Sequence, residues 1–302
     1  MSAIDTAEAK GRAAERTGPL FARALCAAAR TDRGTVRAEN EDAFVCRPDL
    51  GLFAVIDGMG GESAGRTAAE LARQALLDAG EPVRGLLAAN DRIVRMARSH
   101  QDLQGMGCVA SVMRIENGVA TIAHVGDTRI YLAVPAGCEQ LTRDHTVAAS
   151  EQERLGLSHG LADGLEGRNQ VTRDLGGDKK QGEGWFDRLE VALEKDALVL
   201  MCSDGIPGAL GNEALFDHLR EAQRSGLAPE DLADGLIEMA LEKGARDNIT
   251  ALVVRHEAEG PAPSPSPAAA GRLQLLSLLR GAALPFLIGV AVGFALRGFV
   301  LH

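Results

Sequence analysis

The stretch LFAVIDGMGG at residues 52–61 indicates both the fold and a functional site. Its first five residues are apolar, which is typical of a buried β-strand. The strand ends at Asp57-Gly58, and the glycines that follow let the backbone approach a ligand closely. An aspartate in this place is held by a rigid scaffold, so the stretch predicts a strand that presents a carboxylate.

The same pattern recurs along the chain. Acidic residues stand at the ends of other expected strands or at turns, in Glu41-Asp42, Gly126-Asp127, Asp204-Gly205 and Asp247-Asn248. A single Asp-Gly pair is more often a turn than a ligand, and spacing along the chain does not prove that such residues meet in space. Two Asp-Gly turns that each follow a buried strand are a stronger signal.

Carboxylates and backbone carbonyls are hard oxygen ligands. Without nearby His or Cys they suit Mg²⁺ or Mn²⁺ rather than zinc or copper. If Asp57, Asp204 and Asp247 converge, they predict a two-metal hydrolase site. Two ions about 4 Å apart can share one aspartate and acidify a bridging water that attacks phosphorus in line.

The bulk composition excludes several classes of protein. The 302 residues suffice for one large domain or two small ones. A net charge of −10 argues against nonspecific binding to nucleic acid. The five cysteines form no CxxC pair, so a reducing compartment is the simplest interpretation. The charged N-terminus does not resemble a secretory signal.

Hydrophobic patterning predicts strands and helices in blocks. Strands are expected at 44–46, 52–56, 108–115, 119–125, 129–134, 189–193, 197–202 and 249–255, and helices at 63–77, 83–98, 148–155, 213–223 and 229–243. Asn117-Gly118 favours a tight hairpin turn. Blocks of this kind favour an α+β fold with antiparallel sheets covered by helices over a doubly wound parallel fold.

Composition divides the chain into four parts. We expect a loose arm or short helix at 1–22, a folded catalytic domain at 23–258, a Pro/Ser/Ala linker at 259–272 and an apolar C-terminal segment at 273–302. The stretch from 147 to 170 is polar and is expected to continue from a short helix into a flap.

The C-terminal segment is interpreted as a transmembrane or tail-anchor helix. Residues 281–296 carry no charge and would span roughly 24 Å as a helix, somewhat less than a bilayer core of ~30 Å. Flanking arginines or the apolar residues that follow would close the gap. An amphipathic or partner-packing helix is the alternative. Arg272 and Arg280 place the main domain on the cytoplasmic face of the membrane by the positive-inside rule.

Seven motifs, in order, resemble those of the metal-dependent protein phosphatases of the 2C type (PPM), in the form found in bacterial serine/threonine phosphatases. They are RAENEDA at 37–43, DGMGG at 57–61, HVGDTRIY at 124–131, LTRDHT at 141–146, VTRDLG at 171–176, CSDG at 202–205 and DNIT at 247–250. Ordered matches over most of the folded region are far more specific than any single motif.

The resemblance implies a four-layer α-β-β-α sandwich with two central antiparallel β-sheets and a metal site in a cleft at one edge. It implies that Asp57 bridges two Mg²⁺ or Mn²⁺ ions and that the Gly58 carbonyl binds one of them. Asp204 and Asp247 complete the first metal, and Glu41 approaches the second directly or through water. The implied mechanism is direct attack by metal-bridging hydroxide, without a phosphoenzyme.

Three further residues take roles from the resemblance. Arg37 is expected to hold the substrate phosphate, since its guanidinium matches phosphate oxygens in bidentate geometry. Asp42 is expected to orient metal-bound water. Asp127, together with Asp204, matches the position of a weak third metal in bacterial members.

The chain departs from the family pattern at two positions. Met59 stands where some members have a histidine that can protonate the leaving group, so the leaving-group acid is unassigned. His124 and His145 receive no catalytic role, because a lone histidine near a strand end is more often structural. Asp174 stands where a small residue is commoner.

The sequence therefore predicts a serine/threonine protein phosphatase for signalling phosphoproteins, which are targets of a serine/threonine kinase. Two alternatives stay open. One is a regulatory or binding module of the same fold with weak catalysis, and the other is a two-metal hydrolase of small phosphate esters.

Overall fold

The computed structural model describes residues 15–16, 20–22, 25–60, 63–155, 170–177 and 184–257. The expected linker, the apolar segment at 273–302 and most of the expected flap lie outside these residues. Within the described ranges, no helix is both long enough and apolar enough to cross a bilayer.

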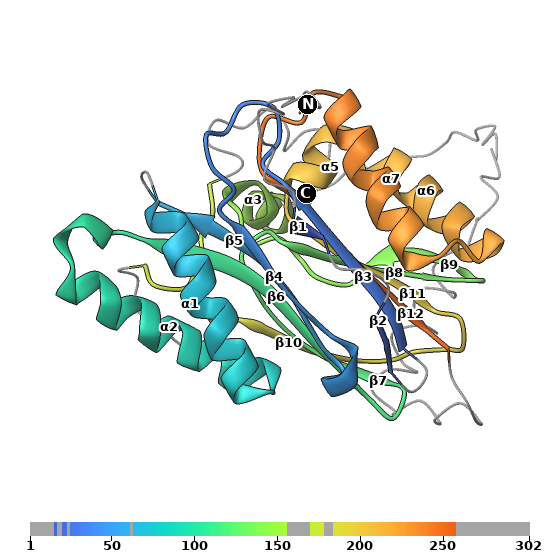
Figure 1. Cartoon of the computed structure of the whole chain (residues 1–302), viewed down its shortest axis with the longest axis horizontal. Coiled ribbons are helices and arrows are strands. Elements are labelled where there is room, and N and C mark those ends of the chain that lie inside the picture. The colour runs from blue at the N-terminus through green and yellow to red at the C-terminus, as the bar shows by residue number, and fades with distance from the viewer. Residues whose placement is uncertain are drawn as a thin grey trace, which may run out of the picture. The chain divides into compact units, whose positions relative to one another are not determined.

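Two antiparallel sheets form the centre of the domain (Figure 1). One has the strand order β10-β7-β6-β5-β4, with β4 (Asp42–Arg47), β5 (Leu52–Met59), β6 (Gly107–Glu116), β7 (Val119–Val125) and β10 (Asp187–Ala192). The other has the order β1-β3-β12-β11-β8-β9, with β2 also paired to β3. Its strands are β1 (Glu15–Arg16), β2 (Leu20–Ala22), β3 (Leu25–Asp32), β8 (Arg129–Val134), β9 (Gly137–Gln140), β11 (Leu198–Cys202) and β12 (Ile249–His256).

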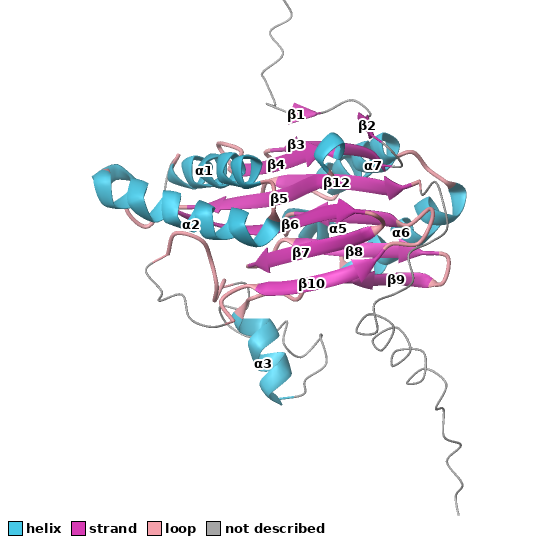
Figure 2. Ribbon diagram, turned by 90° about the horizontal axis from the view of Figure 1, so that it is seen from below, coloured by secondary structure: helices cyan, strands magenta, loops and turns pink. Residues whose placement is uncertain are grey.

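Helices cover the outer face of each sheet (Figure 2). The helices α1 (Ala64–Ala79) and α2 (Pro82–Ser99) pack on the sheet that contains β5. The other sheet is covered by α5 (Gly205–Leu210), α6 (Asn212–Ser225) and α7 (Pro229–Glu242). A further helix, α3 (Val147–Leu155), follows β9. This arrangement confirms the predicted four-layer α-β-β-α sandwich.

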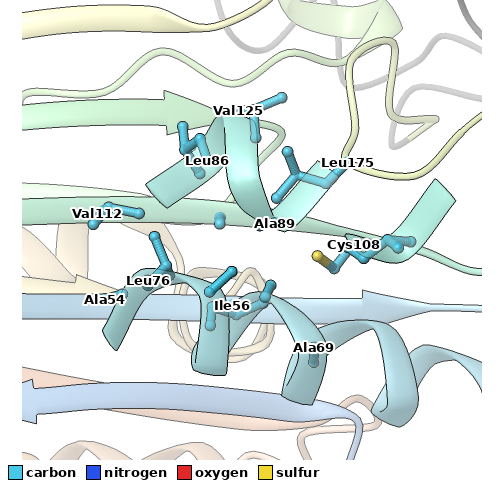
Figure 3. Packing of buried hydrophobic residues seen from close by; sticks show 14 of the residues in the cluster. Ala54, Ile56, Ala69, Leu76, Leu86, Ala89, Cys108, Val112, Val125 and Leu175 are labelled. Atoms are coloured by element: carbon cyan, nitrogen blue, oxygen red, sulfur yellow. The ribbon is translucent and has the colours of Figure 1, made fainter. Parts of the chain in front are cut away.

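The first five residues of β5, Leu52 to Ile56, are apolar because both faces of the strand are buried there. Phe53 and Val55 lie in the cluster between the two sheets. Ala54 and Ile56 lie in the cluster beneath α1 and α2, where they pack with residues such as Leu76 (Figure 3). Alternate residues of a strand point to opposite faces, so a strand in the middle layers needs a continuous apolar run.

The hairpin between β6 and β7 turns where the sequence predicted. Asn117 and Gly118 have positive φ angles of 52° and 75°, which are the values that a tight two-residue turn requires. The prediction for the N-terminal arm was wrong in part. Where we expected a loose arm or a short helix, β1 and β2 pair with β3. The free edge of β3 supplies backbone partners that local sequence preference does not reveal.

Replacing Leu252 with alanine is expected to destabilise the domain by about 2–5 kcal/mol, because Leu252 is fully buried between the two sheets. Chemical denaturation measures this change. Leu227→Ala is the matched control, since that side chain is 37% exposed and its loss is expected to cost less than about 0.5 kcal/mol. Equal costs for the two variants would contradict the assignment of Leu252 to the core.

Candidate metal centre

Pairing between β4 and β5 brings the first group of acidic residues together. Asp42 lies directly across the ladder from Asp57. The backbone N–H of Gly58 donates to the carbonyl of Glu41 at 3.2 Å. Antiparallel register therefore places Glu41 and Asp42 beside the end of β5, although they are distant from it in sequence.

The second group comes from the other sheet. Asp204 follows the end of β11, and Asp247 precedes the start of β12, which pairs with β11. The two turns lie in close contact, because a Cβ on Gly205 would lie 2.1 Å from the carbonyl oxygen of Asn248. Glycine at position 205 is what permits this approach.

Residues from both sheets line one cavity of about 330 Å³. Of the residues that the resemblance pointed to, seven are in its lining: Arg37, Glu41, Asp57, Gly58, Asp127, Asp204 and Asp247. Asp42 lies behind this lining and is 9% exposed. The sandwich thus gathers acidic residues that the sequence alone could not place together.

Burial makes this cluster of negative charge costly. Burial raises the pKa of Asp204 to about 6 and that of Asp42 to about 7, and neighbouring carboxylates add to both effects. The pKa of Asp57 is raised well above its ordinary value, first by burial and then by the charges of Asp42 and Asp204. Burial also raises the pKa of Glu41. Such a cluster needs protons or cations to be stable.

The donor set fits hard divalent cations in its chemistry. The described residues that line the cavity include several carboxylates and no cysteine or histidine. Behind them, the buried Oδ1 of Asp42 has no hydrogen-bond partner within the described chain. The arrangement as it stands is more open than a closed ion cage. Among the described residues, no group of three or more His, Cys, Asp or Glu side chains is placed to hold an ion.

Arg37 lies at the mouth of the cavity. Its Nη2 donates to Oδ2 of Asp247 at 2.8 Å, and both side chains are about half exposed. The guanidinium therefore faces the acidic cluster from the solvent side, where an incoming anion would meet it. An exposed pair of this kind contributes little to stability, so the arginine can exchange partners.

Asp127 reaches the cavity from the turn after β7. The preceding Gly126 has φ of 99°, and a Cβ there would lie 2.1 Å from the side chain of Val109, so only glycine fits. Asp127 is buried, and burial raises its pKa to about 8, with the charge of Asp204 as the next cause. The tight turn fixes this carboxylate beside the others.

His124 and His145 are both buried, and neither is among the described residues that line the cavity. His145 accepts from the backbone N–H of Gly126 through Nδ1 at 3.1 Å, and its Nε2 lies 3.3 Å from Asp187 Oδ2. Nε2 of His124 donates to the carbonyl of Arg143 at 2.9 Å, since that oxygen can only accept. Both rings support the backbone that carries Asp127.

The two departures from the family pattern lie in different places. Met59 lines the cavity. Asp174 accepts a hydrogen bond from the backbone N–H of Gly177 at 3.0 Å, and it is not in the lining formed by the described residues. Asp174 therefore stabilises a local turn, and the thioether at position 59 leaves the cavity without a proton donor there.

Sequence reasoning missed the residues that hold the acidic loops. The side chain of Asn248 accepts from the backbone N–H of Glu41 at 2.9 Å and donates to the carbonyls of Arg33 and Glu39. Ser203 and Thr250 donate to Asp42. All three belong to the matched motifs CSDG and DNIT, so the signal was present, but a motif does not state which neighbour a side chain bonds.

Gly58→Ala is expected to lower both activity and the melting temperature, because the new Cβ would lie 2.2 Å from the carbonyl oxygen of Gly65 and 2.7 Å from that of Glu41. Overpacking of this kind costs about 1–3 kcal/mol and would displace the acidic loops. Gly235→Ala is the control, since a Cβ there meets nothing within 4 Å. Thermal melts and initial rates on both variants test this, and an active, stable Gly58→Ala protein would refute it.

The sequence is similar to a known protein family and to several named proteins. Residues 28–249 match the family described as Protein phosphatase 2C. A protein named serine/threonine phosphatase stp, from Listeria welshimeri, is 32% identical over 242 residues, which cover 74% of this chain and 93% of that relative. The serine/threonine protein phosphatase PstP from Mycobacterium tuberculosis is also 32% identical, over 75% of this chain and 44% of its own length.

Solved structures with the same architecture include that mycobacterial enzyme. The crystal structure of the M. tuberculosis serine/threonine phosphatase PstP/Ppp aligns with a TM-score of 0.69 at 28% identity, over 78% of this chain and 99% of the other. A structure of the PstP catalytic domain in complex with two manganese ions aligns with a TM-score of 0.67 at 28% identity, over the same shares of both chains.

Proposed function

This chain belongs to the protein phosphatase 2C family and is a serine/threonine protein phosphatase, and from that premise we propose that it uses two Mg²⁺ or Mn²⁺ ions at the cavity built by Asp57, Asp204 and Asp247. Phosphoproteins are its substrate class, and we propose that they are targets of a serine/threonine kinase. The observation that carries the proposal is the gathering of carboxylates from both sheets in one cavity.

The chain's own residues divide the work of binding. Asp57, the Gly58 carbonyl, Asp204 and Asp247 would hold one ion, and Asp57 and Glu41 would hold the other. When bound, the ions would neutralise the phosphate charge and lower the pKa of the attacking water. Asp42 orients that water, which attacks phosphorus directly without a phosphoenzyme.

Substrate binding is proposed to begin at Arg37. Its guanidinium, which pairs with Asp247 in this structure, has the planar donor geometry that matches two phosphate oxygens. The bond from phosphorus to the serine or threonine oxygen then breaks, and the leaving oxygen takes a proton from water in the cavity. Met59 cannot supply that proton.

A substrate panel tests the metal and the substrate class together. The purified full chain with Mn²⁺ is expected to hydrolyse a phosphothreonine peptide faster than nucleotides or small phosphate esters, and chelation is expected to stop the reaction. A preference for nucleotides would overturn the substrate class. Undiminished hydrolysis after complete chelation would overturn the metal dependence.

Asp127 is proposed to hold a weak third ion together with Asp204. Support comes from the burial of Asp127 and from the charge of Asp204, which raises the pKa of Asp127. Mn²⁺ titration of Asp127→Asn by calorimetry tests this. The variant is expected to lose a weak site and keep the two stronger ones, and unchanged stoichiometry would refute the third site.

Residues 273–302 are proposed to anchor the domain to the cytoplasmic face of a membrane as a single span. The support is the uncharged run at 281–296 with its flanking arginines. A tether of this kind raises the local concentration of the enzyme near membrane-bound substrates. Fractionation of the full chain and of a form without residues 272–302 tests the anchor, which fails if both forms are soluble.

A further inference from the structure

The carboxylate of Asp42 is held at the junction of the two sheets. Asp42 begins β4 in one sheet, whereas Thr250 lies in β12 of the other. One carboxylate oxygen, Oδ2, accepts a hydrogen bond from Thr250 Oγ1 at 2.6 Å and another from Ser203 Oγ at 2.7 Å. Asp42, Ser203 and Thr250 are all buried, so water does not compete for these bonds.

The direction of every bond in this network can be assigned. A carboxylate only accepts, so the single hydroxyl proton of Thr250 points to Asp42. Thr31 must then donate to Thr250 across their 2.7 Å contact. Thr31 in turn accepts from Asn40 Nδ2 at 2.8 Å, and Asn40 Oδ1 accepts from the backbone N–H of Asp42 at 3.1 Å. The bonds close a ring that begins and ends at Asp42.

Ser203 is fixed in the same way. Its oxygen accepts from the backbone N–H of Thr250 at 3.0 Å, which leaves its proton for Asp42. Oδ2 of Asp42 therefore carries two oriented bonds, whereas Oδ1 is buried and has no partner within the described chain. An unpartnered buried carboxylate oxygen needs a reason, because its desolvation is otherwise uncompensated.

We propose that Thr250 and Ser203 are positioning residues for hydrolysis, which fix the Asp42 carboxylate so that Oδ1 is presented to the attacking water. This inference rests on the proposed function, in which Asp42 orients that water. Two bonds to the same oxygen prevent the carboxylate from rotating about its terminal torsion, which is otherwise a soft, two-fold rotation. The ring through Thr31 and Asn40 keeps the hydroxyl of Thr250 pointing toward the carboxylate.

Three variants separate positioning from stability. Thr250→Val removes the hydroxyl and keeps the shape, and Thr250→Ser keeps the hydroxyl. Thr142→Val is the matched control, since Thr142 is also buried and accepts from the backbone N–H of Ile130 at 3.0 Å, away from the cavity. The measurements are kcat and KM of the full chain with Mn²⁺ and a phosphothreonine peptide, melting temperatures, and crystal structures of the wild type and Thr250→Val.

Thr250→Val is expected to lower kcat by about 10–100-fold, as loss of an orienting partner does at metal sites. KM is expected to stay within about twofold, because the substrate contacts are untouched. Thr250→Ser is expected to restore most of kcat. Thr142→Val is expected to lower the melting temperature as Thr250→Val does, but to keep kcat. The crystal structures are expected to show the Asp42 carboxylate rotated in Thr250→Val only.

Several results would overturn the proposal. They are an unchanged kcat in Thr250→Val, an equal loss of kcat in Thr142→Val, or an Asp42 carboxylate that keeps its orientation in the Thr250→Val crystal. Failure of the proposed function is a different result, in which the wild type hydrolyses no phosphopeptide with any divalent ion. In that case the two crystal structures still decide whether Thr250 orients Asp42.

Discussion

Asp204→Asn is expected to reduce phosphatase activity by at least about 1,000-fold, or about 4 kcal/mol of transition-state stabilisation. Asparagine keeps the shape of the side chain but removes the charge that a divalent ion requires. The same change is expected to raise the melting temperature of the metal-free protein. Burial and the charge of Asp247 already disfavour an ionised carboxylate at position 204. No capping bond is lost, because the Asp204 side chain does not cap α5.

Initial rates with Mn²⁺ and melting curves in a chelator test both parts of this prediction. Asp217→Asn is the control, since that side chain on α6 is 74% exposed and lies outside the cavity lining. It is expected to change neither quantity. An Asp204→Asn protein that retains activity would remove Asp204 from the metal centre, and one that melts lower in chelator would show that the acidic cluster is not under electrostatic strain.

The metal-free protein is expected to lose stability as the pH rises from 6.5 to 8. In the folded chain the pKa values of Asp42 and Asp127 are raised to about 7 and about 8, whereas the same groups are fully ionised when unfolded. The folded state therefore binds more protons in this window, and stability falls as they are released. We expect a loss of about 2 kcal/mol, which corresponds to about 4–8 °C in melting temperature.

Melting curves in chelator and in Mn²⁺ across this pH range test the prediction. Mn²⁺ replaces the protons and binds only the folded state, so the downward slope is expected to disappear. Asp127→Asn is expected to make the slope in chelator shallower. Buried His124 does not affect the result. Its pKa is lowered to about 3, so it makes stability fall only as the pH drops below its ordinary pKa of 6.5, outside this window. A rising or flat curve in chelator would contradict the argument.

The fold was predictable wherever strands were apolar on both faces. The runs at 52–56, 197–202 and 249–255 match β5, β11 and β12 closely, since burial on both sides leaves a clear signal. Strand β3 was not predicted, although all eight of its residues pair with β12. Its sequence LCAAARTD is rich in alanine, which has low strand preference, and the sheet context overrides that preference.

The site was predictable as a set of residues and not as a geometry. Each aspartate alone resembled a turn, and only the ordered motifs joined Asp57, Asp204 and Asp247. The chain order could not reveal that Asp42 faces Asp57 across a ladder, or that Thr250 reaches Asp42 from the other sheet. Those contacts depend on strand register and on sheet packing, which are properties of the whole domain.

Pairing between β3 and β12 has a consequence for synthesis of the protein. Eight residues of β3, Leu25 to Asp32, pair with eight residues of β12, Ile249 to His256. On the ribosome, β3 and β4 emerge early, but the strand between β3 and β11 is the last to be made. The sheet that contains β3 therefore stays incomplete until residue 256 has left the exit tunnel. Phosphatase activity therefore requires that synthesis has passed β12, and a translation product truncated before Ile249 would be inert.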